Sequence, residues 1–242
     1  MTTLKYNWFS LNNKISVRET KKRFYNRFCF SVEYFCPGGR CLSSSLSESD
    51  IKAALELRTS LAVYNYAGSW RAKKTQFELF EVSNLANMLK VKLDNPDNIK
   101  FRVEEPHIQI YAETEGLLYQ IASGDLSAQK CNLRRVTAPK DQDTLELLNS
   151  GSILLTKSNG YLYKIILKDG KYANGNKAAI RNYLINLGDV IKMSPSVLRN
   201  LSTTYDHAWN IWFYSNDKNI VAMIELIEPG CVTNIHMVVD SQ

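Results

Sequence analysis

Two stretches of the sequence share one pattern at a constant spacing of 103 residues, so that Tyr111 aligns with Tyr214. Residues 107–122 read HIQIYAETEGLLYQIA and residues 210–225 read NIWFYSNDKNIVAMIE. In both, apolar residues alternate up to the tyrosine, as on a half-buried strand. A residue able to cap a helix follows, Thr114 or Asp217, and apolar residues then recur on one helix face. Each stretch therefore predicts a strand leading into a short helix.

The segments around each stretch extend this into two similar halves. In the first half we expect strands at 27–35, 99–103, 107–112 and 130–136, with a helix at 47–64. In the second half we expect strands at 161–170, 189–193, 208–215 and 231–239, with a helix at 176–188. Helical insertions are expected at 75–91 and 194–202. The order predicts an α+β fold of two related ferredoxin-like (βαββαβ) halves, each with a helical insertion.

The chain is accordingly divided into four parts. Residues 1–26 are predicted to be a basic N-terminal arm, and residues 27–138 the first ferredoxin-like half with its helical insertion at 75–91. Residues 139–159 are expected to be a linker with a short helix, and residues 160–242 the second half.

Positive charge is concentrated at the N-terminus. Residues 1–40 contain eight bases and two acids, so this segment alone carries the net charge of +6. The run at 18–27, RETKKRFYNR, combines Arg18, Lys21, Lys22, Arg23 and Arg27 with the rings of Phe24 and Tyr25. Bases attract phosphate and aromatic rings stack on nucleobases, so this run is a candidate nucleic-acid contact. A solvated arm, or a contact with an acidic protein, explains the same residues.

Strand alternation predicts which side chains lie on the sheet face that helices leave open. In the first half these include Lys100, Arg102 and Tyr111. In the second half they include Lys164, Lys168, Trp212 and Tyr214. Aromatics beside cations on a sheet are how several platforms hold unpaired bases. The alternative is that these aromatics simply suit strands, or that the two open faces pack on each other.

The sequence indicates no catalytic residue, cofactor or metal. His107, His207 and His236 are far apart, and no second Cys/His pair gives Cys36 and Cys41 a zinc spacing. Five cysteines at uneven spacing argue against a disulfide framework and favour a reducing compartment, hence the cytoplasm. No apolar run approaches the ~20 residues of a membrane span, and no signal peptide is expected.

Three function classes follow from these features. The favoured one is a non-catalytic accessory protein that binds RNA or DNA. The sequence is rich in Asn, Lys and Ile, as in AT-rich genomes, and this usage suggests that a phage, virus or mobile element encodes the protein. The second is a structural or assembly protein that binds other proteins or self-associates. The third is a nuclease of ferredoxin-like or homing-endonuclease-like architecture, although neither the glycine-rich loop of CRISPR repeat-processing enzymes nor a LAGLIDADG motif is present.

Overall fold

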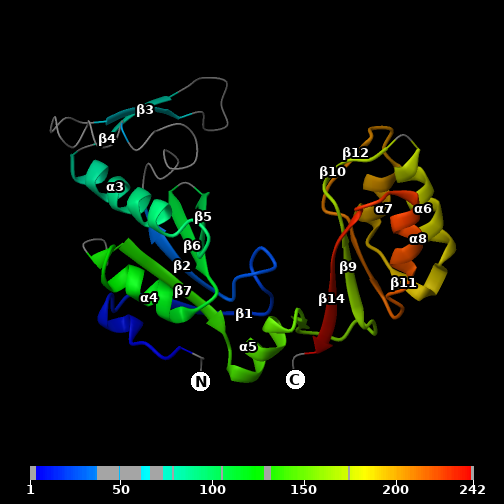
Figure 1. Cartoon of the computed structure of the whole chain (residues 1–242), viewed down its shortest axis with the longest axis horizontal. Coiled ribbons are helices and arrows are strands. Elements are labelled where there is room, and N and C mark those ends of the chain that lie inside the picture. The colour runs from blue at the N-terminus through cyan, green and yellow to red at the C-terminus, as the bar shows by residue number, and fades with distance from the viewer. Residues whose placement is uncertain are drawn as a thin grey trace. The chain divides into compact units, whose positions relative to one another are not determined.

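A computed structural model describes residues 4–36, 49, 61–65, 73–77, 79–104, 106–127, 132–173 and 175–240. The chain divides into two compact units, residues 1–146 and 147–242. The fold is α+β, with two five-stranded sheets and, in the described part of the chain, six α-helices (Figure 1).

The sheet of the first unit has the strand order β1-β7-β2-β6-β5. Its strands are β1 (Ser16–Thr20), β2 (Phe30–Phe35), β5 (Ile99–Glu104), β6 (His107–Ala112) and β7 (Leu133–Pro139). Neighbours are antiparallel except for β1, which runs parallel to β7. Helix α3 (Leu79–Asp94) contacts β5, and α4 (Glu115–Ser123) contacts β2 and β6. A separate hairpin pairs β3 (Leu61–Asn65) with β4 (Lys73–Phe77).

The sheet of the second unit has the order β11-β13-β9-β14-β8. Its strands are β8 (Ile153–Leu155), β9 (Tyr163–Leu167), β11 (Ile191–Lys192), β13 (Trp212–Ser215) and β14 (Val232–Asp240). Its helices are α6 (Asn176–Asn186), α7 (Pro195–Ser202) and α8 (Ile220–Ile227), and α5 (Gln142–Asn149) spans the boundary between the units. A short ribbon pairs β10 (Gly170–Lys171) with β12 (His207–Ala208).

Both sheets repeat one arrangement. In the first sheet, the edge strand β1 is parallel to β7, and β2, β6 and β5 follow in that order. In the second sheet, the edge strand β8 is parallel to β14, and β9, β13 and β11 follow in that order. In both, the strands next to the edge strand are therefore the last, first, third and second of the remaining four along the chain. Tyr111 and Tyr214, aligned in the sequence repeat, both lie on the third of these strands, and each pairs with a lysine on the second, Lys100 or Lys192. The repeat in sequence thus corresponds to a repeat in strand order and register.

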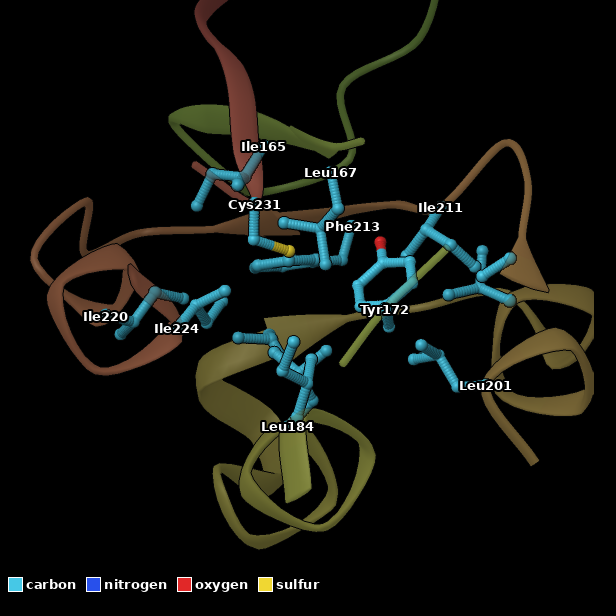
Figure 2. Packing of buried hydrophobic residues seen from close by; sticks show 14 residues of the cluster. Ile165, Leu167, Tyr172, Leu184, Leu201, Ile211, Phe213, Ile220, Ile224 and Cys231 are labelled. Atoms are coloured by element: carbon cyan, nitrogen blue, oxygen red, sulfur yellow. The ribbon is translucent and has the colours of Figure 1, made fainter. Parts of the chain in front are cut away.

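The core of the second unit shows why these segments fold as they do (Figure 2). Alternate residues of the sheet, Ile165 and Leu167 on β9 and Phe213 on β13, point toward the helices. Leu184 on α6 and Ile224 on α8 face them, and all five are at most 2% exposed. Removing such side chains from water supplies roughly 1.5–3 kcal/mol each.

Several predicted elements differ from the structure. Residues 61–64, the end of the predicted helix 47–64, lie in β3, where the β-branched Val63 and the aromatic Tyr64 are residue types that suit a strand. The rest of that prediction lies outside the described residues, apart from Ser49. The predicted insertion 75–91 is strand β4 up to Phe77 and helix α3 from Leu79.

The predicted strand 208–215 is also wrong in its first part. Only Trp212–Ser215 belongs to β13, because Asn210 has a φ of 54° and interrupts the extended backbone after β12. Similarly, α8 is preceded by Asn219 rather than capped by Asp217, whose carboxylate accepts the Asn219 N–H at 2.8 Å. Thr114 caps α4 as predicted, since its side chain accepts the Leu117 N–H.

The predicted N-terminal arm is part of the first unit. Lys5 N and Trp8 Nε1 donate to Glu115 on α4, each at 2.8 Å, and β1 pairs along its whole length with β7. Trp8, in a short 3₁₀ turn (Trp8–Ser10), is 1% exposed. Trp8 and Ile15, which lie between the basic residues, are buried and attach this segment to the first unit, although most of its other residues are exposed.

Candidate nucleic-acid interface

The open face of the first sheet lies opposite the core and carries several of the residues singled out from the sequence. Register places Lys100 beside Tyr111 and Arg102 beside Gln109. The same row continues from Tyr111 through Ser31 and Thr137 to Arg18, which is exposed on β1. Alternation had predicted that Lys100, Arg102 and Tyr111 share a face, and their pairing agrees with that.

A tight hairpin at Phe24–Phe28 covers Tyr111. Its two ends exchange backbone hydrogen bonds of 2.8 and 2.9 Å, and Tyr25 and Asn26 both have positive φ, 52° and 58°. The rings of Phe24 and Tyr25 lie 5.0 and 5.1 Å from that of Tyr111, which is 2% exposed. The exposed ring on this face is therefore Tyr25, at 44%, with Lys100 Nζ 4.5 Å from its centroid.

A chain of side-chain hydrogen bonds crosses this face. The Tyr111 hydroxyl donates to Gln109, and Gln109 Nε2 donates to Glu33 at 3.1 Å. Arg135 also donates to Glu33, at 3.1 Å. Burial raises the pKa of Tyr111 to about 12, so its hydroxyl remains a donor at neutral pH. This series of hydrogen bonds fixes the polar residues of β2, β6 and β7 relative to each other.

Two arginines that sequence reasoning missed lie on the same face. A β-bulge interrupts the pairing of β7 with β2 between Glu33 and Tyr34, so that Glu33 pairs with Arg135 and Tyr34 with Leu133. The Arg134 guanidinium lies 5.4 Å from the ring centroid of Phe35, which shares the face of Glu33. Arg135 Nε is buried and has no partner among the described residues. Strict alternation would have put these neighbours on opposite faces, so only the bulge reveals the pair.

The open face of the second sheet carries a smaller set. Lys164 Nζ lies 4.3 Å from the centroid of the Trp212 ring, and Trp212 contacts Tyr214 edge to face at 5.4 Å. Lys192, not singled out from the sequence, pairs with Tyr214 from β11 and is exposed. The sequence indicated this position of Lys192 only through the expected strand, in which Lys192 follows the inward-facing Ile191. All of these side chains lie on the face turned away from the core of Figure 2.

Other residues singled out from the sequence lie elsewhere. Lys168 does not join the open face: its ammonium pairs with Glu228, whose side chain is 8% exposed, and lies over the buried ring of Tyr172. Arg27 pairs with the exposed Glu113. The remaining bases, Lys21, Lys22 and Arg23, lie in the turn that joins β1 to the Phe24–Phe28 hairpin.

The second unit also has a polar hollow of about 500 Å³ beside the start of α6. Lys177 and Arg181 line it together with residues 201–206. The Lys177 ammonium is buried and donates to Thr203 Oγ1 at 2.6 Å, to the Tyr205 carbonyl at 2.5 Å and to the His207 carbonyl at 3.4 Å. Burial lowers the pKa of Lys177. With its three protons engaged, this lysine holds the 203–207 loop on α6.

The histidines and cysteines contact ordinary neighbours. His236 Nδ1 lies 3.0 Å from the Gly151 carbonyl, and the His207 ring stacks on that of Trp209. The side chains of Cys29, Cys36 and Cys231 are buried. Within the described ranges, no three His, Cys, Asp or Glu side chains are grouped as metal ligands would be. No helix in the same part of the chain is both long and apolar enough to cross a bilayer.

No known protein family matches this sequence, and no curated protein matches it at a significant level.

Proposed function

We propose that the chain binds nucleic acid, in single-stranded form, on the open faces of two ferredoxin-like units. The observation that carries this proposal is the lysine–tyrosine pair repeated on the same face of both sheets, Lys100 with Tyr111 and Lys192 with Tyr214. In each unit an accessible cation thus adjoins aromatic rings, the combination that holds stacked bases and their phosphates.

The charge balance of the first open face supports a phosphate-bearing ligand. Five bases lie on it against two acids, namely Arg18, Lys100, Arg102, Arg134 and Arg135 against Glu33 and Glu104. The two acids pair with Arg135 and Arg102, which leaves an excess of three positive charges.

Tyr25 is the ring that we expect to stack on a base in the first unit. It is the accessible ring of its cluster, and it packs edge to face on the buried ring of Tyr111, which Phe24 also contacts. In the second unit Trp212 has this role, beside Lys164. Stacking on one such ring contributes about 1–3 kcal/mol, largely independent of base identity.

The test is fluorescence anisotropy with labelled single-stranded RNA, single-stranded DNA and duplex DNA of one length. With about three phosphates contacted, affinity for a single strand should fall roughly 20-fold between ~50 and ~200 mM salt. The double variant K100Q/R134Q should weaken binding and flatten this salt dependence, and Tyr25→Ala should weaken binding at every salt concentration.

The control is K90Q/K92Q, which removes the same charge from α3, a helix that contacts the sheet from its other side. It should bind as the unchanged protein does. Equal losses in the two double variants would mean that net charge, rather than the open face, governs binding. Absence of binding at low salt would remove the proposal.

A further inference from the structure

Strand β14 of the second unit has a long unpaired edge. On one side it pairs with β9 over Val232–Met237, and on the other it pairs with β8 only over Val238–Asp240. Among the described residues, Val232–Met237 therefore have a strand neighbour on one side alone. Such an edge offers N–H and C=O groups to another strand. Its sequence, VTNIHM, contains neither proline nor lysine, two residues that block edge pairing. A bulge lies between Val232 and Asn234, and the Val232 N–H already donates to Glu225 Oε1 at 2.6 Å, so the part of the edge open to another strand follows the bulge.

Exposed apolar side chains lie next to this edge, on the helix side of the sheet. Ile235 and Met237 on β14 are 41% and 52% exposed, although Ile235 pairs with the fully buried Ile165. Met223 and Leu226 on α8, which contacts β14, are 45% and 77% exposed. Together these four side chains are called the α8/β14 patch. They leave roughly 400 Å² of apolar surface, within the range of functional patches on monomers.

In the first unit, the corresponding place in the fold is covered. By register, Val136 and Ala138 on β7 correspond to Ile235 and Met237, and they are 1% and 0% exposed. The N-terminal segment seals that edge: Trp8 packs edge to face on Tyr119 of α4 at 5.2 Å, and Asn12 Nδ2 donates to the Leu133 carbonyl at 2.8 Å. Strand β1 then pairs with β7 over Arg135–Pro139.

The solvent-facing residues of α8 also differ from those of α4. At the repeat spacing of 103 residues, Met223 and Leu226 of α8 correspond to Gln120 and Ser123 of α4. Those two residues are polar and exposed, as expected for a helix surface that meets only water. The second unit thus has apolar residues at solvent-facing helix positions, and its edge strand β8 pairs with β14 only from Val238 onward, whereas β1 covers the corresponding part of β7.

We propose that a second copy of this chain covers the α8/β14 patch, with β14 pairing antiparallel to β14 of the other copy about a two-fold axis. An uncharged apolar patch is complementary to itself, whereas the basic open faces would repel their own copies. An antiparallel strand edge is likewise self-complementary about a two-fold axis. Methionines at two of the four positions adapt readily to an opposing surface.

The size of the patch fits a weak dimer. Two patches bury roughly 800 Å² between them, and the paired edges with their flanking residues bring the contact near the ~1,200 Å² lower bound of specific interfaces. A dissociation constant in the micromolar range or weaker is therefore expected.

Sedimentation velocity of the full chain, from about 1 µM to about 1 mM, tests the proposal over the range of weak affinities. The unchanged protein should pass from monomer to dimer. The variant M223Q/L226S gives α8 the residues that α4 carries at the same positions, so it should fold normally and shift dimerisation at least tenfold toward higher concentration. Ile235→Lys, a charge on the strand edge, should do the same. Leu162→Ser is the control: this residue is also exposed, at 55%, but lies outside the patch.

Hydrogen exchange separates this contact from any other. Amides of residues 232–237 should exchange more slowly at high protein concentration, and this protection should be absent in Ile235→Lys. A monomer at every concentration would overturn the proposal. A dimer that both patch variants retain, or that gains no protection at 232–237, would place the interface elsewhere and overturn it equally. A larger species in which β14 gains protection but no two-fold dimer is present would refute the second-copy arrangement.

Discussion

Replacing Glu115 with glutamine should detach the N-terminal segment from α4. The carboxylate is 7% exposed and accepts three N–H groups: Lys5 N on Oε2 at 2.8 Å, and Tyr6 N and Trp8 Nε1 on Oε1 at 3.2 and 2.8 Å. A glutamine keeps one acceptor oxygen but turns an NH₂ group toward the Lys5 N–H. Two of the three hydrogen bonds are then accepted by a neutral oxygen instead of a charged one, and the third becomes a donor–donor contact. The free energy of unfolding should fall by about 3 kcal/mol. Loss of negative charge in the first turn of α4 adds a few tenths.

Urea unfolding, followed by tryptophan fluorescence and by near-ultraviolet circular dichroism, measures this cost. The matched control is Glu113→Gln, two residues earlier, whose carboxylate is 55% exposed and pairs with Arg27 at the surface. That substitution should cost at most about 0.5 kcal/mol. If Glu115→Gln were as mild as the control, the buried carboxylate would not anchor residues 5–8, and the reasoning that places this segment in the first unit would fail.

Two further predictions concern the second unit. Burial raises the pKa of Glu228, but hydrogen bonds from Lys168, Asn176 and the Ala173 N–H outweigh it and hold that pKa below its usual value. A carboxyl with a depressed pKa stabilises the fold above its unfolded-state pKa and loses that contribution as the pH falls through its folded-state pKa. The free energy of unfolding should therefore decline below about pH 4, and Glu228→Gln should flatten this decline. An unchanged slope would contradict the role of Glu228. On α8, Ile224→Ala should cost about 2–4 kcal/mol by leaving a cavity in the core of Figure 2, whereas Leu226→Ala, at 77% exposed, should cost less than about 0.5 in dilute monomer. Thermal unfolding of the two variants at low concentration checks this, and similar losses would mean that Leu226 is a core residue.

The sequence repeat predicted the elements that are strongest in local pattern. Strand β6 with helix α4, and the tyrosine strand β13 with α8, fall at the aligned stretches because alternation and helix spacing are both pronounced there. The strand hairpin β3–β4 was missed because residues 61–65 and 73–77 obtain their pairing from each other, which a helical spacing read along one segment does not reveal. Strand β1 was missed because it also depends on a pairing partner outside its own segment, and that partner, β7, lies more than a hundred residues away.

The candidate site was predictable only as far as alternation holds. Lys100, Arg102 and Tyr111 share a face because β5 and β6 are regular. The bulge beside Glu33 placed Arg134 over Phe35, and a hairpin of two left-handed residues placed Tyr25 over Tyr111. Lys168 turned to the buried carboxylate of Glu228, a partner 60 residues distant in sequence. Each departure depends on a tertiary neighbour that no local pattern encodes.

The parallel pairing of β1 with β7 has a consequence for synthesis on the ribosome. Ser16 leaves the exit tunnel first, and its partner Arg135 follows 119 residues later. At about 10 residues per second, β1 waits roughly ten seconds for the strand that receives it. Closing so long a loop is also slow for an isolated chain. Strand β1 of the nascent first unit therefore has no pairing partner throughout most of its translation, and the sheet is completed only when the last strand emerges.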